Sequence, residues 1–224
     1  MEMVKDIFEV VDKKISDCDF DFGKLADIYR KWLDCIKKKT GTSGGFTGLS
    51  EYLIFKTILL YLEQKLEIRF KPKRKTKYAY FFVSTDGQIL VTHATSIDNY
   101  MEKAADKLGK ISWSDDETAK KLRPDIVIFK KLTDNHYKPE AIIQIKVYAV
   151  NPQAIKGEVE KIKKIASVRN GKPLLAIIFF FEPATVHKEE LQKEFAYIIT
   201  PKEPSNFKRM LREIESKLLP AFKL

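Results

Sequence analysis

The chain has 224 residues, enough to bury one sizeable core, and carries a formal net charge of +10 at pH 7. Because Lys and Arg gain from releasing phosphate counterions, this charge favours an acidic partner, with nucleic acid first. The apolar stretches are too short to span a membrane, and residues 1–6 lack the basic-then-apolar pattern of a secretion signal, so we expect a cytoplasmic protein with no membrane partner. Abundant Lys, Glu and Ile with few Asn, Gln and Cys resembles the composition of hyperthermophile proteins.

The first part of the chain is predicted to be helical. Helical spacing of apolar residues predicts helices over 4–15 and 23–39, and a Gly-rich loop follows at 40–45. The loop matches neither GxxxxGK[ST] nor GxGxxG, so it is not a phosphate-binding loop. We therefore expect an N-terminal helical extension over 1–45 and a main domain over 46–224.

Residues 47–64 form a strongly apolar pattern that predicts a largely buried helix. We expect Glu51 in its first turn, where a carboxylate can complement the helix dipole. The alternative interpretation is that Glu51 faces a functional site, with Glu63 at the far end of the helix as the second choice.

Strands are predicted over 66–70, 78–83 and 88–92, the last two joined by a tight turn at Asp86-Gly87. The connection at 71–77 is strongly basic and is either a phosphate clamp or a solvated turn. Its cations are Lys71, Lys73, Arg74, Lys75 and Lys77. A short helix over 98–108 and a polar segment over 112–121 then lead to the next strand.

Two later strands carry the most informative residues. The strand at 123–129 opens with Pro-Asp, which places Asp125 near its beginning, and the apolar strand at 141–148 is interrupted only by Gln144 and Lys146. Side chains alternate along a strand, so Gln144 and Lys146 share one face. Turn-forming residues at 131–140 predict a hairpin that brings Asp125 beside both. Carboxylate and amide oxygens suit Mg²⁺.

The remaining elements complete an α/β arrangement. A crossover helix is predicted over 153–168, followed by a buried strand over 174–181 that lies parallel to an earlier one. A strand over 195–199 and a helix over 205–218 follow.

The Pro-Asp and Gln-x-Lys pair in this order of elements resembles the PD-(D/E)xK nuclease superfamily, from about Leu49 to Phe181. Gln144 stands at the usual acidic position, a version similar to that in the nuclease subunit of a two-component cut-and-paste transposase. The resemblance implies a restriction-endonuclease-like fold with a mixed central sheet flanked by helices. It also implies an endonuclease that hydrolyses DNA, with Lys146 assisting the attacking water. Mg²⁺, or Mn²⁺ as a substitute, would be held by Asp125, Gln144, the main-chain carbonyl of Ile145 and Glu51.

Three alternatives remain open at this stage. Gln144 motivates the first alternative, a DNA-binding module that keeps the fold but has lost turnover. A phosphate clamp does not distinguish sugars, so an RNA-directed nuclease or RNA-binding protein is the second. A structural protein with an acidic partner is the third. The sequence leaves a homodimer open.

Overall fold

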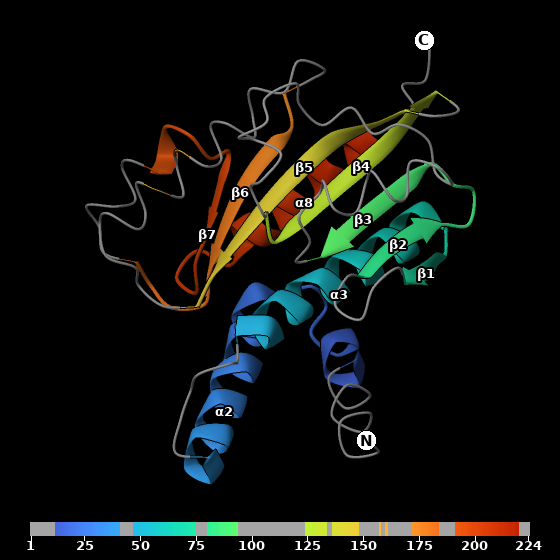
Figure 1. Cartoon of the computed structure of the whole chain (residues 1–224). Coiled ribbons are helices and arrows are strands. Elements are labelled where there is room, and N and C mark those ends of the chain that lie inside the picture. The colour runs from blue at the N-terminus through green and yellow to red at the C-terminus, as the bar shows by residue number, and fades with distance from the viewer. Residues whose placement is uncertain are drawn as a thin grey trace.

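The computed structural model describes residues 12–40, 47–74, 80–93, 124–133, 136–147, 157, 160, 172–183 and 191–219 (Figure 1). Within these residues the fold is α/β, with a seven-stranded mixed sheet in the order β1-β2-β3-β4-β5-β6-β7. The strands are β1 (Phe70–Arg74), β2 (Tyr80–Ser84), β3 (Ile89–His93), β4 (Ile126–Thr133), β5 (His136–Lys146), β6 (Leu174–Phe179) and β7 (Tyr197–Ile199). Strands β1 to β5 pair antiparallel, whereas β6 lies parallel to both β5 and β7. Among the described residues, α3 (Thr47–Leu66) and α8 (Ser205–Leu218) pack on the sheet, and α2 (Phe22–Thr40) packs against these two helices.

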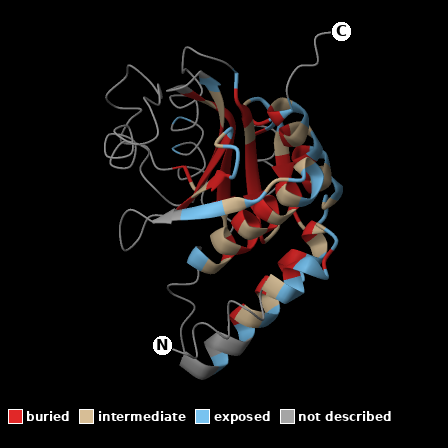
Figure 2. Cartoon of the chain, turned by 90° about the vertical axis from the view of Figure 1, so that its right-hand side faces the viewer, coloured by how far each residue is buried: buried red, intermediate tan, exposed pale blue. Residues whose placement is uncertain are grey.

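The two faces of the sheet bury different sets of side chains. One face, here called the helical face, packs against α3 and α8 and contributes to the main core Ile89, Val91, Ile126, Ile128, Ala141, Ile143, Ile145, Ala176 and Ile178. The alternate residues, including Thr92, Val127, Ile142 and Gln144, therefore lie on the opposite face. A smaller core on that face joins Ile177, Phe179, Leu191, Phe195 and Ile198. Figure 2 shows the buried residues concentrated in the strands and on the helix sides that touch them.

The helices follow their apolar patterns. Helix α3 is apolar almost all round because it contacts α2, α8 and the sheet, as expected for a buried helix. Helix α8 is amphipathic, and it buries one stripe formed by Phe207, Met210, Leu211, Ile214 and Leu218. Helix α2 packs against both and contributes Phe22, Leu25, Ala26, Tyr29 and Leu33 to the same main core.

Within the described residues, several expected helices and strands are confirmed. The helices expected at 23–39, 47–64 and 205–218 are α2, α3 and α8, the strand at 174–181 is β6, and its parallel pairing with β5 is observed. Residues 12–16 are helical, as are Gly157 and Glu160. Thr40, expected in the Gly-rich loop, is the last residue of α2. Residues 41–45 of that loop, the helix expected at 98–108 and the segment at 112–121 lie outside the described residues.

Three local expectations are wrong. Helix α3 extends to Leu66, so the strand expected at 66–70 is instead β1, over Phe70–Arg74. Glu51 lies beyond the first turn of α3, which contains no acidic residue. The β4–β5 turn is also shorter than expected, because strand structure continues to Thr133 and resumes at His136. In the first and third cases pairing or packing with a neighbouring element extends regular structure past the residues that local signals mark as its end. Glu51 lies beyond the first turn because the helix already begins at Thr47.

No helix in the described segments is both long enough and apolar enough to cross a membrane.

Candidate metal and nucleic-acid site

The antiparallel register of β4 and β5 brings the two sequence motifs together. Ile126 pairs with Ile143, so Asp125, which immediately precedes β4, falls opposite Gln144. Pro124 is buried and Asp125 is half-buried. The hairpin therefore places the carboxylate of Asp125 at the end of β5 that carries Gln144 and Lys146, as the sequence predicts.

A direct contact confirms this placement. The main-chain N–H of Ile145 donates a hydrogen bond to Oδ2 of Asp125, with a nitrogen–oxygen distance of 2.6 Å. In a strand the N–H and C=O of one residue point to the same side, so the Ile145 carbonyl also points toward Asp125. The carbonyl of Lys146 points the other way and accepts a hydrogen bond from the Phe180 N–H, at 3.0 Å. Two oxygen-bearing groups, the Asp125 carboxylate and the Ile145 carbonyl, thus converge beside β4.

The side chain of Gln144 is buried on β5 and leaves a polar atom without a described partner. Its side chain is only 3 % exposed, and its Oε1 has no hydrogen-bond partner among the described residues. A buried acceptor without a partner costs about 1–3 kcal/mol, so native structures rarely keep one without a reason. An amide oxygen in this state, next to a carboxylate, fits a hard cation such as Mg²⁺.

Lys146 lies one pleat beyond Gln144 and is half-buried. The alternate residues Ile143, Ile145 and Val147 belong to the main core on the helical face. Gln144 and Lys146 therefore share the opposite face of the sheet, as their spacing predicts.

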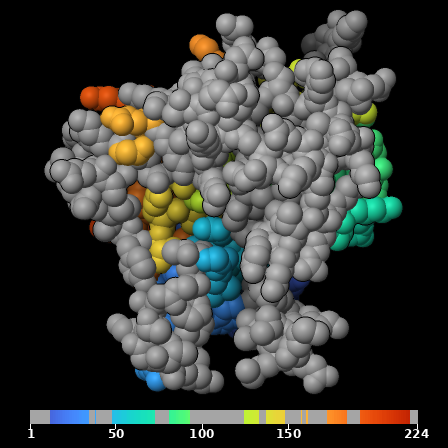
Figure 3. Space-filling model, viewed as in Figure 1, coloured from blue at the N-terminus to red at the C-terminus, as the bar shows by residue number. Residues whose placement is uncertain are grey.

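Helix α3, which carries Glu51, packs against the helical face of the sheet. The helix contacts β3 and β5, the strands on either side of β4. Glu51 is half-buried and lies one turn before Phe55, whose ring packs against Phe82 in β2 at 5.3 Å between centroids. Residues at i and i+4 share a helix face, so Glu51 lies on the side of α3 turned to the helical face, whereas Gln144 and Lys146 lie on the opposite face of the sheet. Figure 3 shows atoms of α3 (cyan), β4 (lime) and β5 (yellow) next to one another on the visible surface.

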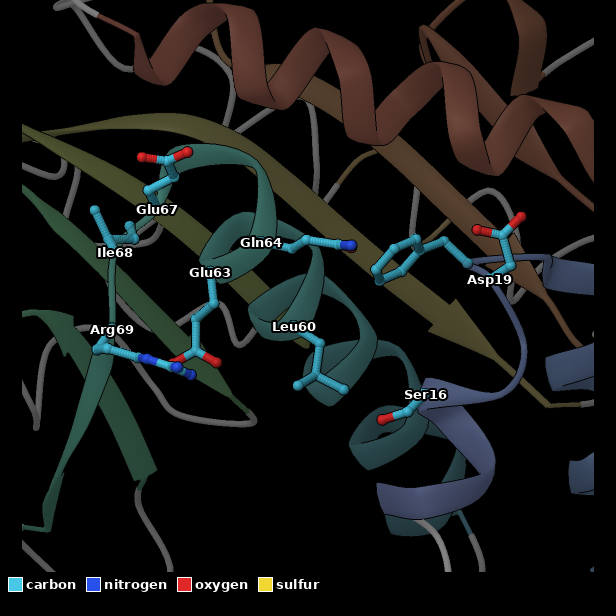
Figure 4. A pocket seen from close by; sticks show the side chains of 9 residues that line it. Ser16, Asp19, Leu60, Glu63, Gln64, Glu67, Ile68 and Arg69 are labelled. Atoms are coloured by element: carbon cyan, nitrogen blue, oxygen red, sulfur yellow. The ribbon is translucent and has the colours of Figure 1, made fainter.

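The second choice from the sequence, Glu63, has a different role. It lies twelve residues beyond Glu51, about 18 Å along the helix. Its Oε1 accepts a hydrogen bond from the Phe70 N–H at 2.9 Å, which ties the end of α3 to β1. Glu63 also lines an open cavity of about 660 Å³ with Asp19, Glu67 and Arg69, and Figure 4 shows these side chains around it. Glu63 is therefore not grouped with Asp125.

The basic segment is divided by the structure. Lys71, Lys73 and Arg74 lie in the edge strand β1, not in a turn, and Lys75 and Lys77 lie outside the described residues. Pro72 sits within β1, a position that an edge strand tolerates because its N–H side is not needed for a further partner.

Among the described residues, no group of three or more His, Cys, Asp or Glu side chains is arranged to hold a metal ion. The candidate set described above instead combines the carboxylates of Asp125 and Glu51 with an amide and a main-chain carbonyl. The contribution of the Ile145 amide to positioning Asp125 has no side-chain signal, so the sequence does not reveal it. Comparison of the chain with protein-family models, curated proteins and solved structures finds no match.

Proposed function

We propose that this chain is a Mg²⁺-dependent nuclease with a restriction-endonuclease-like form of the α/β fold, and that it hydrolyses DNA as an endonuclease. The observation that carries the proposal is the buried Gln144 Oε1 with no described hydrogen-bond partner, held opposite Asp125 at the end of β5. An oxygen-binding cation explains both features, because it supplies the missing partner and balances the neighbouring carboxylate.

The ligands of this cation would be Asp125, Gln144, the Ile145 carbonyl and Glu51. Three of these groups are positioned by β4 and β5, and α3 supplies the second carboxylate. With Gln144 neutral, Glu51 restores charge that a carboxylate at position 144 would otherwise provide. When bound, Mg²⁺ or Mn²⁺ supplies charge that makes water a better nucleophile and neutralises charge developing on the phosphate.

Lys146 would act on the attacking water. It would orient the water or help to deprotonate it, and its ammonium group would stabilise the pentacovalent phosphorus. The water oxygen bonds to phosphorus as the bond from phosphorus to the 3′ oxygen breaks. The leaving oxygen takes up a proton, so the products carry 5′-phosphate and 3′-hydroxyl ends.

The order of elements supports the same proposal. Helix α3 precedes the antiparallel strands β3, β4 and β5, and β6 returns parallel to β5. The Pro-Asp and Gln-x-Lys residues therefore lie on neighbouring strands at one end of the sheet, which is the arrangement that the resemblance predicts.

Metal titration by calorimetry, run beside plasmid nicking, tests this function. Wild type is expected to bind Mg²⁺ or Mn²⁺ and to nick supercoiled DNA, and Asp125→Ala should lose both properties. Asp34→Ala removes an exposed carboxylate on α2 and is the matched control that should retain both. Gln144→Glu should preserve nicking and tighten Mg²⁺ binding, because a carboxylate of similar reach adds one favourable charge. Metal binding that does not depend on Asp125 would exclude the site.

The same assays separate the other candidates. DNA binding without nicking under any divalent metal would identify an inactive DNA-binding module. Stronger competition by duplex RNA than by duplex DNA would identify an RNA-directed protein. Sedimentation with and without DNA would show whether cutting requires a homodimer.

A further inference from the structure

Gln144 has unlike neighbours on the two strands beside it. On the β4 side Asp125 lies opposite Gln144, and on the β6 side the parallel register pairs Gln144 with Ile177. Side chains that are paired in this way point to the same face, and their strands lie about 4.8 Å apart. The carboxamide of Gln144 is therefore flanked by a carboxylate on one side and by an aliphatic side chain on the other.

Ile177 belongs to the smaller core on the face opposite α3 and α8. It is only 1 % exposed, and it packs with Phe179, Leu191, Phe195 and Ile198. None of these five side chains carries a hydrogen-bond donor. Together they form an apolar wall along the β6 side of Gln144, so the wall offers the amide oxygen no partner.

The apolar wall continues beside Lys146. Phe179 pairs with Lys146 in the register of β5 and β6, and Phe179 is fully buried. The methylene stem of a lysine packs well along such a surface while its ammonium group turns to a polar neighbour. Both polar side chains of β5 thus have apolar neighbours on β6, and Asp125 supplies the polar group on the β4 side.

We infer that Ile177 is a positioning residue, which withholds a donor from Oε1 of Gln144 and leaves that oxygen for the cation beside Asp125. This inference rests on the proposed function. A donor at position 177 would satisfy Oε1 without metal, and the metal would then have to displace it. One hydrogen bond of about 1 kcal/mol corresponds to about a fivefold loss of metal affinity.

The decisive experiment compares valine with threonine at position 177 in the full chain. The two side chains have nearly the same shape, but only threonine carries a hydroxyl donor. In calorimetric Mg²⁺ titrations, Ile177→Val should bind as wild type does, and Ile177→Thr should bind about fivefold more weakly. Ile198→Thr places the same hydroxyl in the apolar wall but one strand further from Gln144, because Ile198 pairs with Ile177. This control should bind Mg²⁺ as wild type does.

A merely structural role of Ile177 predicts a different pattern. At saturating Mg²⁺, Ile177→Thr should nick plasmid DNA at the wild-type rate, because the metal has displaced the hydroxyl from Oε1. In a Gln144→Leu background, valine and threonine at position 177 should give equal Mg²⁺ affinity, since the acceptor is gone. There the threonine protein should melt at least about 3 °C below the valine protein, because its buried hydroxyl has lost its partner. With Gln144 present this difference in Tm should be smaller.

The outcomes separate this inference from the proposed function. If wild type binds no Mg²⁺, the proposed function fails and the role of Ile177 fails with it. If wild type binds Mg²⁺ but the valine and threonine variants bind it equally, only the role of Ile177 is overturned. Equal weakening in Ile198→Thr overturns it too. So does a threonine variant that does not fold where the valine variant folds, because a hydroxyl bonded to Oε1 is tolerated in a core.

Discussion

Replacement of Gln144 by Leu should stabilise the metal-free protein while weakening its response to metal. The buried Oε1 has no described partner, and removing an unsatisfied acceptor recovers about 1–3 kcal/mol. Taking the low end of that range for an apolar group of similar size, the net gain is about 1 kcal/mol. For a chain of this length that gain raises Tm by about 3 °C in EDTA.

The metal response should change in the opposite direction. At a metal concentration one hundred times Kd, wild type gains about 2.7 kcal/mol, or about 8 °C in Tm. Gln144→Leu lacks one ligand and should show a smaller gain. Ile142→Leu alters an apolar residue on the same face of β5 and should keep the full metal-dependent gain.

Thermal unfolding of the three proteins in EDTA and in Mn²⁺ measures both effects. The reasoning is refuted if Gln144→Leu lowers the stability of the metal-free protein by more than about 1 kcal/mol, since Oε1 would then have a partner. A full metal-dependent gain in Gln144→Leu would show that Gln144 is not a ligand.

Three further changes test other parts of the molecule. Lys146→Ala should reduce nicking about a hundredfold to a thousandfold while duplex affinity in EDTA stays near that of wild type, and full activity would remove Lys146 from the mechanism. Lys130→Met should lower Tm by about 3–6 °C, because Nζ of Lys130 donates to the carbonyls of Lys217 (3.0 Å) and Leu219 (2.7 Å) at the end of α8. Lys193→Met, at an exposed position, is its control, and an equal loss there would contradict the capping role. Burial and the hydrogen bond to Glu215 raise the pKa of Tyr61 well above 10.0, so the folded chain keeps a proton that the unfolded chain releases as pH rises above about 10. The stabilisation is complete below that pH and is lost above it. Tyr61→Phe should therefore show a shallower fall in the free energy of unfolding between about pH 8 and about pH 11, and an equally steep fall would contradict this assignment.

The sequence by itself determined the parts of the fold that depend on periodic burial. The alternation of Gln144 and Lys146 with Ile143 and Ile145 predicts which residues share a face, and the structure confirms it. The apolar pattern of α3 predicts its burial in the same way. These predictions succeed because side-chain direction follows directly from the period of a strand or helix.

Only the tertiary structure decided the bounds of β1 and the face of the sheet on which Lys71 lies. Local signals end a strand at Phe70, because Lys and Pro are poor strand formers. Pairing with β2 and packing of Phe70 against the main core outweigh that preference, so the strand continues through Arg74. The face of Lys71 then depends on the registers of three strand pairs, which no local pattern contains.

The candidate metal site shows the same division. The sequence identified Asp125, Gln144 and Lys146, because polar residues in apolar strands require a reason. It could not show that the Ile145 N–H holds Asp125, that Gln144 Oε1 is buried without a described partner, or that Glu63 bonds to the Phe70 N–H away from Asp125. Those facts depend on main-chain groups and on contacts between distant segments, which arise only when the strands and α3 pack together.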